Sequence, residues 1–446
     1  MAGSLRRAAF TTMAAWLLLL TASSAAPRAA AFHLARDARD GGASAQFPPQ
    51  FPRQHDAQDR SSGDGRSGSA LESFYDRDAA LELESTYEED DDVARVAGIA
   101  TTRGAGRDPA ALIATSAGFA YPMAAPIYVA KSQLPVMMSL KTTWSKYADL
   151  SSWDGSKPCN QWTRIRCWTD GTIRRMEMSG MGLQGSLPGI IGDLTTLEEL
   201  LVTKNWFTHE FPNNLSKLVR LQNLQVWSNY FNHTIPPGLG NLRNLYQLRI
   251  SGNHFEGTIP PCISRLKLLY YMYVDTNKFT GRLPASIGTM TNLQNLFINQ
   301  NSIAGPLPAT ITRLRNLRIL FMSSNPKLTG WLPRNLGNMV SLTDLVMEYC
   351  NFSGPIPPSI TRLTRLQRVL LDNNYFRGIV PENLSRLTDI TILYLERNFL
   401  YGTFPKGISQ LPKLSYLNLH DNMLTGPLPT NFPSTRFIDY GQYNLL

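Results

Sequence analysis

Few side chains in this 446-residue sequence have the type and spacing that catalysis or metal binding needs. His209 and His233 occupy the same position of two neighbouring copies of a repeated pattern. Stacking of the copies would place the two imidazoles about 5 Å apart, close enough to share a metal ion. Both histidines, however, take the place of a turn glycine on an exposed surface. We therefore predict no metal site.

Nucleotide-binding and hydrolase motifs are also missing from the sequence. Residues 180–185 match the pattern G-x-G-x-x-G, but they do not open a helix inside a βαβ unit, so they predict no dinucleotide site. The sequence contains no P-loop, no HExxH motif and no GxSxG motif. We predict no enzyme activity, no catalytic residue and no cofactor.

From Leu197 onward, the sequence repeats with a period of about 24 residues. These repeats are the elements that must position any binding residue. Apolar residues lie five and three residues before a shared asparagine, and two, ten, thirteen and sixteen residues after it. Pro326 is a one-residue insertion, Cys350 replaces the asparagine of the eighth copy, and a degenerate first copy centres on Met181. These eleven copies predict a leucine-rich-repeat solenoid. The nine asparagines are Asn205, Asn229, Asn253, Asn277, Asn301, Asn325, Asn374, Asn398 and Asn422.

Each copy predicts a short strand, a turn and a helical segment. Leu248 and Ile250 alternate as in a strand with one buried face, whereas Leu239, Leu242 and Leu245 have the spacing of a 3-10 or irregular helical turn. Copies that cannot bury their apolar faces alone must stack about 4.8 Å apart, into a rod or arc on the order of 50 Å long. The asparagine amides should turn inward and bond unpaired backbone groups. The predicted fold class is an α/β repeat solenoid, a right-handed superhelix with a parallel β-sheet on its concave face.

Residues 1–130 differ in composition from the repeats. Arg6 and Arg7 precede an apolar run and then small residues, so residues 1–26 predict a cleaved secretory signal peptide, with an uncleaved anchor as the alternative. Residues 27–130 predict a disordered low-complexity segment. Residues 110–130 are long enough for a membrane span, but two prolines favour a linker that packs on the next domain.

Residues 131–172 predict a cap on the N-terminal end of the solenoid. A cap is needed because an open end would expose the core leucines. Leu140 and Trp144 share one face of a short helix, and Trp153 and Trp162 are large apolar anchors.

The four cysteines divide into one pair and two single thiols. Cys159 and Cys167 bracket a short segment of the cap, and in an exported chain we predict that they form a disulfide. Cys262 and Cys350 lie in the fourth and eighth copies, on the order of 20 Å apart along the stack. They are too distant to bridge, so both should be free thiols.

The cap and the repeats resemble the plant-type leucine-rich-repeat family. The cap has the family's order of a helix, a tryptophan and a Cys…Trp…Cys pair. The repeats have its G-x-[IL]-P turn, at residues 257–260, 281–284, 305–308, 354–357 and 426–429. The family includes ectodomains of receptor-like kinases, receptor-like proteins and polygalacturonase-inhibiting proteins, so the resemblance implies a binding module. Residues 173–446 would then hold the eleven repeats and a minimal or truncated C-terminal cap that lacks the family's second cysteine pair.

Two columns of side chains on the concave strand face form the predicted ligand-binding site. Four residues before the asparagine, side chains point to the inner arc, and six consecutive ones are large and apolar: Tyr273, Phe297, Phe321, Val346, Leu370 and Tyr394. Two residues before the asparagine lie Asp275, Glu348, Asp372 and Glu396. A contiguous exposed apolar strip predicts an interaction surface, since strand preference alone would give a mixed column. The carboxylates favour a peptide or a basic protein surface over an acidic polysaccharide as the ligand.

The net charge of +9 arises from an excess of lysine and arginine in residues 131–446. Arg265, Arg313, Arg362 and Arg386 share one position, twelve residues after the asparagine or its substitute, on the outer side. We interpret them as a solvated face, and an acidic polysaccharide or a membrane surface is the alternative partner. This outward register argues against nucleic acid as a partner.

Four sequons begin at Asn214, Asn232, Asn351 and Asn383. Asn214 and Asn383 share an outer position, where a glycan would leave the inner arc free, so we predict that these two are modified. Asn351 lies close to the core turn.

These patterns predict a secreted or cell-surface recognition module that binds a peptide or protein ligand on its concave face. One alternative is an inhibitor of a secreted cell-wall hydrolase, which would use the same face. A second alternative is the truncated ectodomain of a receptor-like kinase. The predicted partners are a peptide or protein ligand and, beyond it, a cell-wall enzyme or a co-receptor. Membrane contact would occur only through an N-terminal anchor.

Overall fold

The computed structural model describes residues 125–427, residue 432 and residues 437–439. The predicted signal peptide and the predicted low-complexity segment up to residue 124 lie outside these residues. Within the described residues, no helix has the length and hydropathy that crossing a membrane requires.

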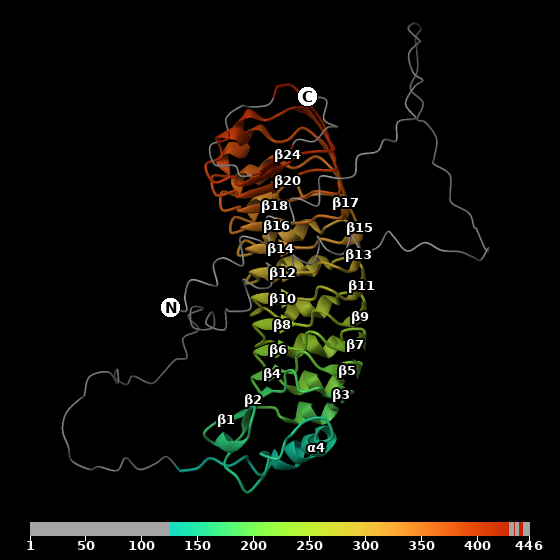
Figure 1. Ribbon diagram of the computed structural model, residues 1–446. Helices are drawn as coiled ribbons and strands as arrows, with labels where there is room; N and C mark the ends of the chain where they lie inside the picture. Colours follow the sequence, from blue (N-terminus) through green and yellow to red (C-terminus); the bar gives the residue numbers. More distant parts are fainter. Residues whose placement is uncertain (1–124, 428–431, 433–436, 440–446) are drawn as a thin grey trace, which may run out of the picture. The chain divides into compact units, whose positions relative to one another are not determined.

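The repeats stack so that each contributes one strand to a single parallel sheet (Figure 1). In the described part of the chain this sheet has thirteen strands, of which β1 (Ile165–Cys167) belongs to the cap and pairs antiparallel with β2. The others are β2 (Ile173–Glu177), β4 (Glu199–Leu201), β6 (Asn223–Gln225), β8 (Gln247–Arg249), β10 (Tyr271–Tyr273), β12 (Asn295–Phe297), β14 (Ile319–Phe321), β16 (Asp344–Val346), β18 (Arg368–Leu370), β20 (Ile392–Tyr394), β22 (Tyr416–Asn418) and β24 (Phe437–Asp439). β24 pairs with β22, so the stack carries one strand more than the eleven copies counted in the sequence.

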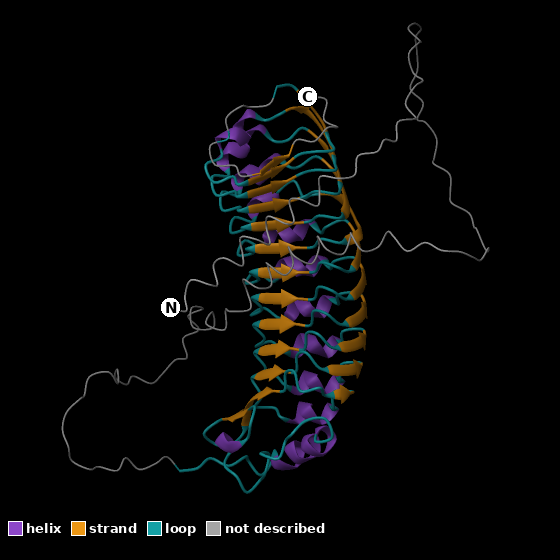
Figure 2. Ribbon diagram, in the orientation of Figure 1, coloured by secondary structure: helices purple, strands orange, loops and turns teal. Residues whose placement is uncertain are grey.

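A second parallel sheet, which the sequence patterns did not predict, lies where a simple turn was expected (Figure 2). Its strands are β3 (Gln184–Gly185), β5 (Trp206–His209), β7 (Tyr230–His233), β9 (His254–Gly257), β11 (Lys278–Gly281), β13 (Ser302–Gly305), β15 (Asn325–Trp331), β17 (Cys350–Gly354), β19 (Tyr375–Gly378), β21 (Phe399–Thr403) and β23 (Met423–Thr425). Six of these eleven strands end at a turn glycine with a positive φ, for example +74° at Gly257. His209 and His233 adopt the same conformation with φ of 68° and 62°, which confirms that they replace a turn glycine.

Short 3-10 helices form the remaining side of each repeat, as the leucine spacing predicted (Figure 2). A proline in extended conformation precedes most of them, as Pro236 precedes η5, and fixes the backbone at the helix entry. They are η3 (Gly189–Asp193), η4 (Asn213–Lys217), η5 (Pro237–Asn241), η6 (Pro261–Arg265), η7 (Ala285–Thr289), η8 (Ala309–Arg313), η9 (Leu336–Asn338), η10 (Pro358–Arg362), η11 (Glu382–Arg386) and η12 (Lys406–Gln410).

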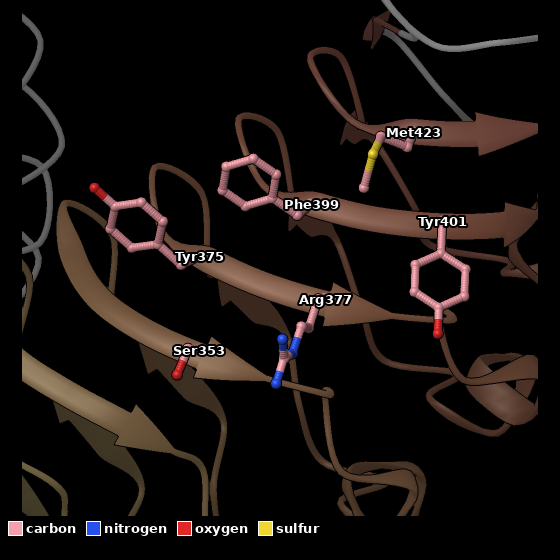
Figure 3. A pocket seen from close by; sticks show the side chains of 6 residues that line it. All are labelled: Ser353, Tyr375, Arg377, Phe399, Tyr401 and Met423. Atoms are coloured by element: carbon pink, nitrogen blue, oxygen red, sulfur yellow. The ribbon is translucent and has the colours of Figure 1, made fainter. Parts of the chain in front are cut away.

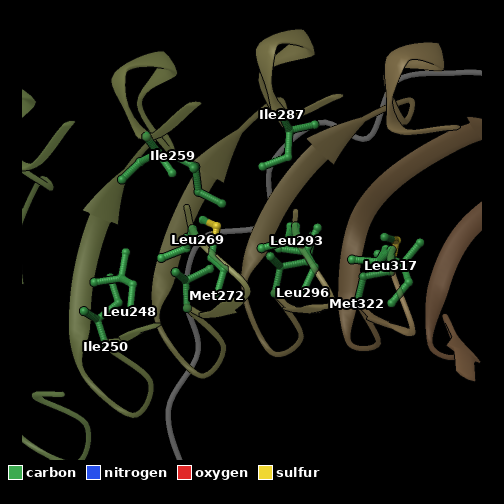
Figure 4. Packing of buried hydrophobic residues seen from close by; sticks show 14 of the residues in the cluster. Leu248, Ile250, Ile259, Leu269, Met272, Ile287, Leu293, Leu296, Leu317 and Met322 are labelled. Carbon is green, nitrogen blue, oxygen red and sulfur yellow. The ribbon is translucent and has the colours of Figure 1, made fainter. Parts of the chain in front are cut away.

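One continuous apolar core fills the space between these three sides. Side chains of successive repeats, such as Leu248, Met272 and Leu296, meet there and are fully buried (Figure 4). Under the second sheet, the phenylalanines two residues after the asparagine stack on one another, with ring centroids of Phe231 and Phe255 6.0 Å apart. Burial of this kind links each repeat only to its neighbours.

The asparagines form the predicted inward ladder. Asn301 Nδ2 donates to the carbonyl oxygens of Val274, Ile298 and Asn299 at 3.0–3.1 Å, and Asn301 Oδ1 accepts from the backbone N–H of Phe279 at 2.9 Å. The other eight asparagines repeat this arrangement, so each amide joins its own turn to the preceding repeat.

Cys350 keeps only part of this function. Its Sγ lies 3.4 Å from the Met322 carbonyl oxygen, which replaces one of the amide donations. The thiol is buried, and burial raises its pKa to about 12, so it is a neutral and unreactive group. Cys262 is half-buried, and both cysteines are free, as predicted.

The cap is built from α4 (Leu134–Trp144) and η2 (Cys159–Gln161) together with β1. Leu140 and Trp144 are fully buried, and the Trp144 ring meets Phe207 edge-on at 6.1 Å, so the helix covers the first repeats as predicted.

A disulfide joins Cys159 to Cys167, and it confirms the predicted pair. The end of the preceding segment also packs on the cap. Cys159 N–H donates to the Ile127 carbonyl, Ala130 N–H donates to the Gly171 carbonyl, and Val129 is buried. The cap therefore begins a few residues before residue 131.

Candidate functional site

The six apolar residues predicted as a binding column lie side by side. Each is the last residue of its concave strand, from Tyr273 in β10 to Tyr394 in β20. The strand register pairs them in one unbroken row, in the order Tyr273, Phe297, Phe321, Val346, Leu370 and Tyr394. We call this set the concave row. None of its members belongs to the core cluster between the sheets.

The concave row is less exposed than the sequence predicted. Tyr273, Leu370 and Tyr394 are half-buried, whereas Phe297 and Phe321 are 5% exposed and Val346 is 1% exposed. The prediction of an exposed strip was therefore wrong for these three. Adjacent strands bring the rings into contact, with centroids 4.9 Å apart for Tyr273 and Phe297 and 5.4 Å apart for Phe297 and Phe321. Such contacts cover part of each ring and produce a packed surface.

The predicted carboxylates lie beside the concave row. Asp275, Glu348 and Asp372 are buried and Glu396 is half-buried. Asp275 Oδ1 accepts from Ser251 Oγ at 2.6 Å, and Asp372 Oδ2 accepts from Asn373 Nδ2 at 2.8 Å. These hydrogen bonds fix the orientation of the two carboxylates.

Glu396 differs from the other three carboxylates. Burial raises the pKa of Glu396 to about 8, and the neighbouring charge of Asp372 contributes in the same direction. Glu396 Oε2 is buried and has no hydrogen-bond partner in the described part of the chain. At neutral pH this side chain is therefore mostly protonated and uncharged.

Sequence reasoning did not identify the basic end of this surface. Arg249, the last residue of β8, pairs in register with Tyr273 and so precedes the concave row. Its guanidinium lies 4.5 Å from the Trp227 ring and 5.5 Å from the Tyr273 ring, while Lys204 Nζ lies 4.6 Å from Trp227. Arg249 Nε is buried without a hydrogen-bond partner among the described residues. The available signal was that Arg249 and Trp227 occupy the same two columns as the predicted site.

The other predicted positions lie away from this surface. Asn214 in η4 and Asn383 in η11 are exposed on the helical side. Asn232 is half-buried beside the His233 ring, and Asn351 is half-buried with its Nδ2 donating to the Pro326 carbonyl at 2.6 Å. Among the described residues, no cluster of three or more histidine, cysteine, aspartate or glutamate side chains could hold a metal ion.

A second surface, also not predicted, is a groove of about 480 Å³ on the outer face of the second sheet (Figure 3). Tyr375, Phe399 and Met423 line one wall, from neighbouring strands β19, β21 and β23. The rings of Tyr375 and Phe399 stack with centroids 5.9 Å apart. Arg377 and Tyr401 line the other wall, two residues further along their strands.

Comparison with known sequences places the repeats in a family. Models of the leucine-rich repeat match residues 244–266, 341–363 and 364–424. The chain is 30% identical over 88 residues to MDIS1-interacting receptor like kinase 1 of Arabidopsis thaliana, across 19% of this chain and 9% of that protein. It is 38% identical over 69 residues to a leucine-rich repeat receptor-like serine/threonine-protein kinase of the same plant, across 15% and 6%. These matches span less than a tenth of the length of either relative.

Solved structures resemble the fold over a larger share of the chain. The plant peptide hormone receptor RGFR1 in complex with RGF2 is 31% identical, with a TM-score of 0.59 over 61% of this chain and 44% of that one. The Arabidopsis receptor kinase HAESA, in complex with the peptide hormone IDA and the co-receptor SERK1, is 26% identical, with a TM-score of 0.58 over 69% and 58%. The observed fold and these matches agree: the chain is built of leucine-rich repeats and is similar to the ectodomains of plant receptor kinases.

Proposed function

We propose that this chain is a non-catalytic recognition module that binds an extended peptide, or an equivalent strip of a protein, along the concave row. The observation that carries the proposal is the chemistry at the two ends of the row. Arg249 presents a buried donor without a partner at one end, and Glu396 presents a buried acceptor without a partner at the other, among the residues that the structure describes. Buried polar groups usually have partners, so these two atoms favour a ligand that supplies them.

The spacing of the strands sets the length of such a ligand. From β8 to β20 the row crosses six strand intervals, which is about 29 Å at 4.8 Å per interval. An extended peptide of about nine residues covers this distance at roughly 3.3 Å per residue. RGFR1 and HAESA were both solved with peptide hormones bound, which supports a peptide as the ligand of this fold.

The charges set the orientation of the ligand. Arg249 and Lys204 favour an anionic end of the peptide near β8, whereas Glu348 and Asp372, joined by Glu396 once it loses its proton, favour a cationic end near β16 to β20. Apolar side chains between the two ends would lie over the phenylalanines and Val346. Complementary charges of this kind fix register and suppress wrong partners more than they add affinity.

A library of synthetic nine-residue peptides tests the proposal with the full chain. Tight binders should carry an acidic group at one end, apolar residues in the middle and lysine or arginine at the other end. The reversed sequence of each binder should bind at least about tenfold more weakly, because its charges would face like charges. Enrichment of neutral or wholly acidic peptides would contradict the proposed site. Inhibition of a polygalacturonase without peptide binding would replace it with the hydrolase-inhibitor function.

The raised pKa of Glu396 predicts a pH dependence of binding. As the pH rises from 7 to 9, Glu396 loses its proton and adds a second negative charge beside Asp372, so affinity for a cationic peptide should rise by up to about tenfold in total over this range. Isothermal titration calorimetry at several pH values measures this, and Glu396→Gln should remove the dependence. The stability of the unliganded protein should change with pH in the opposite direction to its affinity for the peptide. Because the folded state holds the extra proton, its stability should fall as the pH rises from the ordinary value of 4.5 to about 8.

An extracellular location is part of the proposal, and the two outer sequons test it. Asn214 and Asn383 are exposed, so both should carry glycans after passage through a eukaryotic secretory pathway. Treatment with an N-glycosidase should lower the intact mass by two glycans, and the Asn214→Gln, Asn383→Gln double variant should show no such loss. An unchanged mass for the wild-type chain would contradict export through this pathway.

A further inference from the structure

In the middle of the solenoid, negative and positive side chains lie on different faces. Residues 257–381 contain thirteen lysines and arginines but only four carboxylates. The four carboxylates are Asp275, Asp344, Glu348 and Asp372, all on the concave strands or just after them, and all buried. Of the thirteen cations, only Arg368 forms an ion pair with a carboxylate, that of Asp344, within the described part of the chain. The helical side of these repeats is therefore basic and carries no carboxylate.

Pairs of exposed cations on the helical side recur in every second repeat, while the intervening η9 repeat exposes the single Arg334. The helices η6, η8 and η10 each end at an arginine, and a second cation follows within three residues. The intervening helices η7 and η9 end at Thr289 and Asn338, which are uncharged. We call the resulting set the basic ridge: Arg265, Lys267, Arg313, Arg315, Arg362 and Arg365, all exposed.

We propose that the basic ridge is a second binding site, for a linear acidic polysaccharide, independent of the peptide site on the concave row. Two repeats correspond to about 10 Å along the stack. The cation pairs thus recur on the length scale of a disaccharide, so a chain with an acid group on each sugar, or on every second sugar, can meet all three pairs. None of the six cations is paired with a carboxylate among the described residues, so no ion pair within that part of the chain must break.

The ridge favours a soluble polymer over a lipid surface. Membrane-surface sites usually combine cations with tryptophan or tyrosine anchors at the interface. Among the described residues, the exposed tryptophans and tyrosines lie in the cap, on the strands or in the turns beside them, and the helical side exposes only isolated aliphatic residues such as Leu268 and Val340. The buried carboxylates of the concave face would repel the same polymer. The ridge and the concave row therefore select ligands of opposite charge.

Binding of polygalacturonate to the full chain tests this inference, with neutral dextran as the negative control. Affinity electrophoresis at low and at physiological ionic strength should show binding that weakens with salt, as expected for exposed charges. In the ridge variant, Arg313, Arg315, Arg362 and Arg365 are all changed to serine. The matched control changes Lys278, Arg282, Lys327 and Arg377 to serine, which removes the same charge from the second sheet and its edge.

The ridge variant should lose affinity about tenfold or more, and the control variant less than about twofold. Equal losses in the two variants would mean that only net charge matters and would overturn the inference, as would failure of the wild-type chain to bind polygalacturonate at low ionic strength. Tighter binding of an RNA homopolymer or of phosphatidylserine vesicles, at the same ionic strength, would show that the ligand class is wrong. Peptide binding at the concave row should be unchanged in the ridge variant, which separates the two sites.

Discussion

Replacing Asn301 with alanine should lower the free energy of unfolding by about 3 kcal/mol. The Asn301 amide makes four hydrogen bonds to backbone groups, and the residue is buried. Alanine would leave the Phe279 N–H and three carbonyl oxygens with fewer partners in a region that water does not reach, and each buried group left unsatisfied costs about 1–3 kcal/mol. A carbonyl oxygen that keeps a second hydrogen-bond partner costs less than one left with none. The total loss of stability should therefore lie near the lower end of the summed costs.

Cys350→Ser is the matched control for this ladder position. A serine hydroxyl can still donate to the Met322 carbonyl, so the change should cost less than about 1 kcal/mol. Urea denaturation measures both variants, and hydrogen exchange should show the largest loss of protection in the two repeats that Asn301 joins, because each repeat contacts only its neighbours. A loss of less than about 1 kcal/mol for Asn301→Ala would mean that the amide ladder adds little to stability.

Replacing Phe321 with alanine should weaken peptide binding by about 2 kcal/mol, which is about 30-fold. Phe321 lies in the middle of the concave row, and its ring meets that of Phe297 edge-on. Truncation would open a hole in the packed surface and free the neighbouring ring, so the ligand would lose contact at the centre, where hot spots usually lie. Because Phe321 lies outside the core between the sheets, the variant should remain folded.

Phe399→Ala provides the comparison for Phe321→Ala. Phe399 is 49% exposed on the second sheet and is remote from the concave row, so its truncation should leave peptide affinity within about twofold. Fluorescence anisotropy with a labelled peptide from the library, at a temperature where both variants are folded, compares them directly. If Phe399→Ala weakens binding and Phe321→Ala does not, the peptide lies in the groove of the second sheet.

The sequence by itself determined the architecture and the order of the site residues. A constant repeat period makes every residue the neighbour of its equivalents in the copies before and after it, so the spacing alone placed Tyr273 beside Phe297 and Phe297 beside Phe321. The inward asparagines, the helical turns and the cap disulfide followed from the same pattern and from residue type. These features depend on local spacing, which a sequence displays directly.

Only the tertiary structure decided how much of each side chain is exposed and what charge it carries. Phe297, Phe321 and Val346 are buried and the pKa of Glu396 is raised, because burial depends on surroundings that join separate repeats, and no single repeat contains them. The second sheet was missed because most of its strands bury a single residue, as β7 buries only Phe231, so no alternation of apolar residues marks them as strands. The acidic concave face and the basic ridge are built from the same repeats. A net charge summed along the sequence does not show this, because the two faces exist only in the folded chain.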